Sequence, residues 1–149
     1  MLIDSCYIPF SELKIIHSFC EENDIDFKET VSNILENERD FEVEDHRFIH
    51  FDDIDEIQQE ELRSDLYLLG CFNAYFLADN TSLSLKVIEV LQKNEAYEEL
   101  GELVQEDVEN IQRGYAYLDG YGNHFAYYDG KGLELLDVNG SDYYVFRIN

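Results

Sequence analysis

The stretch HFAYYDGKGLELLDVNGSDYYVFRI, residues 124–148, decides the fold class of this chain. Three strand-like runs, rich in aromatic and aliphatic residues, lie at 124–130, 133–138 and 142–148. They are separated by Asp129-Gly130 and Asn139-Gly140, and such Asx-Gly dipeptides favour the tight turns of β-hairpins. We therefore predict a three-stranded antiparallel sheet at the C-terminal end.

The chain before this stretch reads mostly as helix. Apolar residues recur at three- and four-residue spacing after Ser11, which we expect to cap the first helix. Alternation on both sides of Asp45-His46 instead predicts a small N-terminal hairpin over 41–51. The apolar run at 65–78 is predicted to be a central buried helix. The fold class is thus α+β in a single domain, 1–149, with further helices predicted at 26–38, 52–64, 83–93, 95–105 and 106–118.

The chain is extremely acidic. Its 149 residues include 34 Asp and Glu against 10 Lys and Arg, a formal charge of −24. A nucleic-acid binder would carry a basic patch, and anionic membranes attract basic segments, so we expect neither partner. No apolar run approaches the roughly 20 residues of a transmembrane helix. With 45% apolar residues, the chain is expected to fold rather than to remain a disordered polyanion.

The acidic residues are unevenly distributed. Residues 21–65 hold eighteen acids and four bases, and 95–109 hold seven acids and no base, whereas the chain from 110 onward is nearly neutral. Duplex DNA carries one charge per about 1.7 Å, so 24 charges correspond to about 41 Å of duplex. A globule of this length is about 38 Å across. DNA mimicry is therefore feasible if the acids gather on one face; solubility or adaptation to high salt are the plainer alternatives.

Tyrosines accompany the carboxylates, and seven of the eleven fall between Tyr115 and Tyr144. Exposed tyrosines beside carboxylates can receive Arg and Lys side chains through cation–π contacts and ion pairs. Of the pairs Tyr127-Tyr128 and Tyr143-Tyr144, strand alternation predicts at least one exposed member each. The candidate partner-binding residues are Asp40, Glu42, Glu44, Asp45, Asp52, Asp53, Asp55, Glu56, Glu60, Glu61, Glu95, Glu98, Glu99, Glu102, Tyr121 and Tyr128.

No motif indicates catalysis. His46 and His50 share one face of the predicted hairpin, but about 13 Å of strand separates them. A divalent metal would need ligands from elsewhere, and the alternative is two surface histidines. The three cysteines lack CxxC spacing, which favours reduced core thiols in a cytoplasm. We expect no enzyme, no catalytic residue, no metal and no cofactor.

Two stretches carry a resemblance. SDLYLLGCFNAYFLAD (64–79), and GYGNHFAYYDG followed by YYVFRIN within 120–149, resemble small, largely uncharacterised proteins of phages and plasmids. In these proteins a GYG-x-x-F-x-x-YDG element precedes a C-terminal VFR-x-N. The resemblance implies an origin on a mobile element and transfers no catalytic residue. Acidic DNA mimics that inhibit restriction or CRISPR systems are typical cargo of such elements, an argument by analogy.

The leading hypothesis is a non-enzymatic DNA mimic in the bacterial cytoplasm. It would block the basic nucleic-acid groove of a CRISPR effector or restriction enzyme. A homodimer would lengthen the anionic surface. The alternative is a mobile-element adaptor or regulatory protein that binds a protein partner through the tyrosine-rich sheet, with acidity serving solubility.

Overall fold

The computed structural model describes residues 2–3 and 6–149, with side chains from Ile8 onward. The chain divides into two compact units. Unit 1 consists of the N-terminal part up to Ile54 together with Tyr121–Asn149, and unit 2 is the intervening Asp55–Gly120. A compact unit need not fold on its own, so this division does not test the prediction that residues 1–149 form a single domain. Each unit is described by itself.

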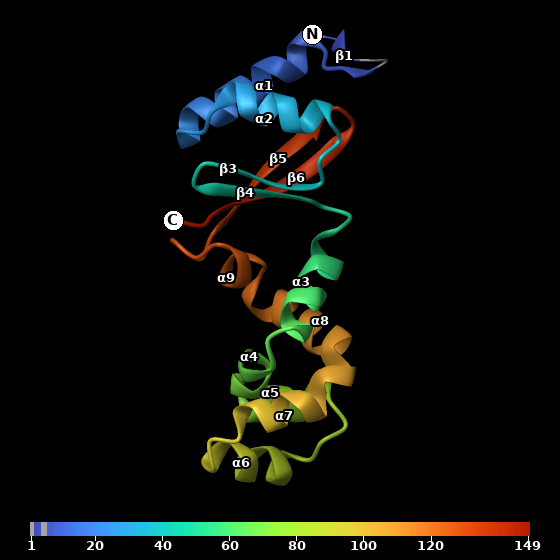
Figure 1. The fold of residues 1–149 in the computed structure, drawn as a ribbon, viewed down its shortest axis with the longest axis vertical. Coiled ribbons are helices and arrows are strands. Elements are labelled where there is room, and N and C mark those ends of the chain that lie inside the picture. Colours follow the sequence, from blue (N-terminus) through green and yellow to red (C-terminus); the bar gives the residue numbers. More distant parts are fainter. Residues whose placement is uncertain (1, 4–5) are drawn as a thin grey trace. The chain divides into compact units, whose positions relative to one another are not determined.

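Unit 1 is built on a four-stranded antiparallel sheet in the order β3-β4-β6-β5 (Figure 1). The predicted hairpin does not stand apart as a separate element. Its second strand pairs with the last strand of the chain, with Phe48 opposite Val145, so two local hairpins form one sheet. The strands are β3 (Asp40–Val43), β4 (His46–His50), β5 (Gly132–Val138) and β6 (Ser141–Arg147).

The predicted strand at 124–130 is wrong. The chain there forms the short helix α9 (Gly122–Phe125) and a turn. A β-carbon on Gly122 would lie 2.9 Å from the Gly130 carbonyl carbon, so this turn folds back tightly against the helix start. Phe125 is buried and its ring stacks on Phe146 at 5.1 Å. Burial of an aromatic side chain against the sheet therefore prevailed over strand propensity.

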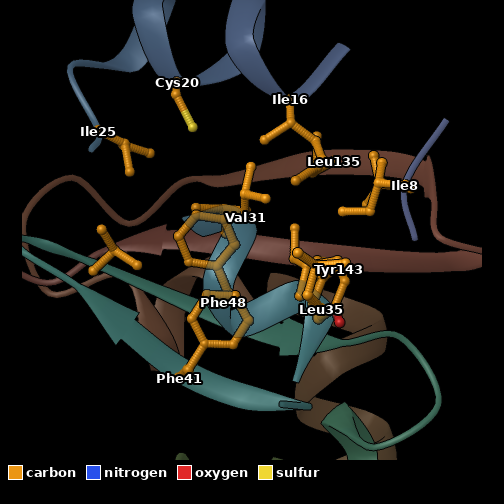
Figure 2. Close-up of a cluster of buried hydrophobic side chains, with 14 residues drawn as sticks. Ile8, Ile16, Cys20, Ile25, Val31, Leu35, Phe41, Phe48, Leu135 and Tyr143 are labelled. Carbon is orange, nitrogen blue, oxygen red and sulfur yellow. The ribbon is translucent and has the colours of Figure 1, made fainter. Parts of the chain in front are cut away.

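Helices α1 (Phe10–Asn23) and α2 (Phe27–Leu35) cover one side of the sheet, and α9 lies on the other (Figure 1). Figure 2 shows Ile16 and Cys20 of α1 directed toward Val31 of α2 and the side chains of the sheet. Helix α1 starts directly after Pro9, so Ser11 lies inside the helix and does not cap it. Before it, the short strands β1 (Leu2–Ile3) and β2 (Cys6–Tyr7) pair with each other.

Unit 2 is helical. The predicted buried helix at 65–78 is two helices, because the chain turns at Phe72 and Asn73. The Asn73 side-chain oxygen accepts hydrogen bonds from the backbone N–H groups of Tyr75 and Phe76 at 2.9 and 3.2 Å, which starts a new helix. The elements are α3 (Ile54–Arg63), α4 (Leu66–Cys71), α5 (Ala74–Asn80), α6 (Leu85–Lys93), α7 (Tyr97–Val104), η1 (Gln105–Asp107) and α8 (Val108–Asp119).

Helices α4 and α7 touch backbone to backbone. A β-carbon on Gly70 would lie 2.9 Å from the Cα of Tyr97, and one on Gly101 would lie 2.8 Å from the Cα of Leu66. Glycine at both positions allows the crossing, which places Leu69 and Leu100 in the core of unit 2.

Candidate partner-binding surface

All fourteen predicted contact carboxylates lie at the surface. Twelve are exposed, and Asp53 and Glu61 are half-buried. Charged side chains are almost never fully buried unless they are paired, so this result alone does not mark a binding site. A carboxylate is more informative as a candidate contact if it forms no hydrogen bond or ion pair within the protein.

Both units are strongly acidic by themselves. Unit 1 carries nineteen acids and six bases, a net charge of −13, and unit 2 carries fifteen acids and four bases, a net charge of −11. Neither unit therefore needs the other to present an anionic surface.

Two of the predicted carboxylates in unit 1 are neutralised by arginines. Asp53 accepts two hydrogen bonds from Arg39, at 2.6 and 2.8 Å, and Asp40 accepts two from Arg47, at 2.9 and 2.8 Å. These hydrogen bonds, donated by Arg39, lower the pKa of Asp53 and raise the pKa of Arg39. These pairs hold the ends of the β3–β4 hairpin, so we regard Asp40 and Asp53 as structural.

The tip of the β3–β4 hairpin keeps its negative charge. Glu42 and Glu44 are exposed, and among the described residues neither lies within ion-pair distance of a base. Within the described part of the chain, the Asp45 carboxylate accepts one long 3.4 Å hydrogen bond from the Asn149 amide and has no ion pair. The tip therefore presents three carboxylates to solvent.

The carboxylates of α3 are largely engaged within unit 2. Asp55 accepts a 2.8 Å hydrogen bond from the fully buried Gln112, which also donates to Gln58 at 2.9 Å. Glu60 pairs with Arg63. This leaves Glu56 as the exposed α3 carboxylate with no ion pair among the described residues.

The least compensated group of acids lies on helix α7 and in the turn before it, and we call it the α7 stripe: Glu95 in the turn, and Glu98, Glu99 and Glu102 on the helix. All four are exposed, and within the described part of the chain none has an ion-pair partner. The helix dipole favours Glu98 and Glu99 in the first turn, but it disfavours Glu102 near the C-terminal end. Glu102 also repels Glu98, four residues earlier. Helix stability therefore does not explain Glu102.

The prediction of at least one exposed tyrosine in each pair is confirmed for Tyr127 and Tyr128, which are both exposed, and is wrong for Tyr143 and Tyr144. Tyr143 is buried, and Tyr144 is half-buried and stacks on Phe51 at 4.0 Å. Tyr121 packs against Tyr144 at 5.1 Å, whereas Tyr128 is exposed in the turn after α9, beneath Arg147. Among the residues whose side chains are described, the exposed tyrosines lie outside the strands. Sequence reasoning missed those of unit 2, Tyr67, Tyr75 and Tyr117.

Two of the four histidines, those proposed as a metal pair, are not on the surface, contrary to the plainer expectation. His46 and His50 are buried in unit 1, at 7% and 6% exposure. The His50 Nδ1 accepts a hydrogen bond from the backbone N–H of Asp52 at 3.1 Å. In the described part of the chain, no cluster of His, Cys, Asp and Glu could hold a metal ion. Cys20 and Cys71 are free thiols; Cys20 is buried, but Cys71 is exposed rather than in the core.

No protein-family model, no curated protein and no solved structure matches this chain. Within the described residues, every helix is too short or too polar to cross a bilayer.

Proposed function

We propose that the chain is a non-enzymatic inhibitor that occupies the basic nucleic-acid groove of a bacterial defence nuclease, either a CRISPR effector or a restriction enzyme. The α7 stripe is the observation that carries this proposal. Its four carboxylates are exposed and have no ion pair among the described residues, so a partner's Lys and Arg could pair with them without breaking internal contacts. The partner is a protein, and the chain binds no nucleic acid itself.

The hairpin tip is a second candidate contact surface and lies in unit 1. Glu42, Glu44 and Asp45 are exposed there, as Glu56 is on α3. By contrast, Asp40, Asp53, Asp55 and Glu60 each hold a donor from their own unit. We therefore rank the α7 stripe and the hairpin tip first among the contact residues. A homodimer could join two such surfaces, and we place the protein in the cytoplasm, where its thiols stay reduced.

The proposal predicts inhibition that depends steeply on salt, because exposed charges are screened within about 10 Å at 0.1 M and about 3 Å at 1 M ionic strength. The assay is cleavage of duplex DNA by a panel of restriction enzymes and RNA-guided effectors, with the chain titrated in. We expect at least one enzyme to be inhibited. Added NaCl and added non-cleavable duplex should each relieve the inhibition.

A charge-matched pair of variants tests the surface. The first replaces Glu95, Glu98, Glu99 and Glu102 by Gln, and the control replaces Glu36, Glu38 and Glu89 by Gln and Asp79 by Asn; all eight positions are exposed. Both variants lose four charges, so a net-charge effect would weaken them equally. We expect the α7 variant to lose inhibition and the control to keep it. Equal behaviour of the two, or inhibition that survives 1 M NaCl, would contradict the proposal.

A further inference from the structure

Unit 1 contains a cavity of about 340 Å³ that the partner-binding hypothesis does not use. It lies between the C-terminal end of α1, strands β4 and β6, and the turn that leads into β5. Its volume falls within the range of small-molecule sites, roughly 300–1,000 Å³. The charged and polar lining residues include Glu22, Asp24, His46, Asp129, Lys131 and Arg147.

Arg147 is the first sign of a ligand. Among the described residues, no Asp or Glu side chain lies within ion-pair distance of it, although the chain has 34 acids. Its Nε donates to the carbonyl of Asn149 at 2.9 Å, and its guanidinium lies 3.8 Å from the Tyr128 ring centroid. The side chain is thus held in place by a main-chain oxygen and an aromatic ring, without an Asp or Glu side chain as partner among the described residues. The other four arginines each pair with a carboxylate: Arg39 with Asp53, Arg47 with Asp40, Arg63 with Glu60, and Arg113 with Glu109.

His46 is the second sign. Its side chain is 7% exposed, and its Nδ1 is enclosed with no hydrogen-bond partner among the described residues. Burial, and then the positive charge of Arg147, lower the pKa of His46, so the imidazole is neutral at pH 7. Because a buried polar group without a partner is costly, the unpaired Nδ1 of this cavity-lining histidine indicates a missing hydrogen-bond partner.

The α1 end of the cavity has the opposite sign. Glu22 and Asp24 are exposed there, and among the described residues neither has an ion-pair partner. They flank the C-terminal end of α1, where the backbone carbonyls carry a partial negative charge. Asp129 lies on the side of Lys131 and Arg147, where its carboxylate accepts the backbone N–H of Lys131 at 3.0 Å and offsets one of the two positive charges. One side of the cavity therefore favours an anion and the other favours a cation.

We propose that this cavity binds a small zwitterion, a free amino acid or a dipeptide, with its carboxylate at Arg147 and Lys131 and its ammonium group at Glu22 and Asp24. A simple anion would meet the carboxylates of α1, and a simple cation would meet the two bases. A zwitterion satisfies both sides at once. This proposal does not depend on nuclease inhibition, because the α7 stripe contributes nothing to the cavity.

The test is calorimetric titration of the full chain with the twenty free L-amino acids and with glycylglycine. We expect at least one zwitterion to bind with one-to-one stoichiometry. Its N-acetyl form, which lacks the ammonium group, and its C-terminal amide, which lacks the carboxylate, should each bind at least tenfold more weakly. The variant in which the α7 stripe is neutralised should bind the same zwitterion unchanged.

Two substitutions place the binding event in the cavity. Arg147→Gln should weaken binding at least tenfold, whereas Arg113→Gln, which removes the same charge from an exposed helix position in unit 2, should not change it. Asp24→Asn should also weaken binding while keeping the backbone geometry, because asparagine tolerates the positive φ of 56° found there. The proposal fails if no zwitterion binds, if the N-acetyl form binds equally well, or if Arg147→Gln and Arg113→Gln bind alike in proteins with unchanged circular dichroism.

Discussion

Replacing Gly101 by alanine adds one methyl group at the crossing of α4 and α7. The new β-carbon would lie 2.8 Å from the Cα of Leu66, and closer still to that residue's carbonyl carbon, at 2.7 Å. Ordinary van der Waals contact begins at 3.4 Å. The obstacle is backbone, which no change of side-chain rotamer can relieve, so the two helices must move apart.

The cost can be worked from two opposing effects. Overpacking a buried site costs about 1–3 kcal/mol, and we take the upper end because the clash is with backbone on both sides of the crossing. Alanine favours a helix over glycine by about 1 kcal/mol. The expected net loss is about 2 kcal/mol in the free energy of unfolding. Unit 2, Asp55–Gly120, falls in the size class of 60–100 residues, for which this loss lowers the melting temperature by about 8–16 °C.

Gly114 of α8 provides the matched control. A β-carbon there would meet side-chain atoms, Phe76 Cε1 at 2.9 Å and the Asn80 amide at 3.0–3.2 Å. Side chains can move away, and the same gain in helix propensity applies. Gly114→Ala should therefore stay within about 1 kcal/mol of the parent protein. The measurement is urea and thermal unfolding followed by circular dichroism at 222 nm. If Gly101→Ala is as stable as Gly114→Ala, the close helix crossing is not part of the folded protein.

Two further predictions concern the pH dependence of stability and the independence of unit 2. The pKa of His46 is lowered in the folded chain, whereas in the unfolded chain it has its ordinary value of 6.5, so the unfolded chain binds the proton more readily. The contribution of His46 to the free energy of unfolding is therefore full above about pH 6.5. It falls as the pH drops through and below that value. His46→Gln should reduce the difference in unfolding free energy between pH 7.5 and pH 5.5, and an unchanged difference would show that His46 is not buried as a neutral group. A fragment of residues 55–120 should fold alone, because its core cluster is made of its own residues; circular dichroism without helical signal or a cooperative melt would show that unit 1 is required.

Local sequence signals identified most helices and two hairpin turns, one between β3 and β4 and one between β5 and β6. Asn139-Gly140 joins β5 to β6, and helical spacing located α2, α3 and α6 to within a few residues. The predictions were wrong where two signals in the same stretch favoured different structures. The apolar run from Asp65 onward looked continuous, yet Asn73 caps a new helix within it. The tyrosines at 127 and 128 looked like a strand, yet the adjacent Phe125 is buried in α9.

The candidate surface was only partly readable from the sequence. Exposure of the carboxylates follows from the cost of burying charge, and it could be stated in advance for each one. Their pairing could not, because Asp53 lies fourteen residues from Arg39, and Asp55 lies 57 from Gln112. The α7 stripe was signalled by the absence of any base between 95 and 109.

The acidic character, the mixed helix and sheet content, and most of the turns could be predicted from the chain alone, because charge, side-chain periodicity and turn chemistry act over a few neighbouring residues. The pairing of β4 with β6, and the position of His46 opposite Arg147 about a hundred residues away in the chain, became visible in the folded protein. Strand pairing and cavity formation depend on which distant segments meet. That is set by the burial of the whole core, which no single stretch of the chain encodes.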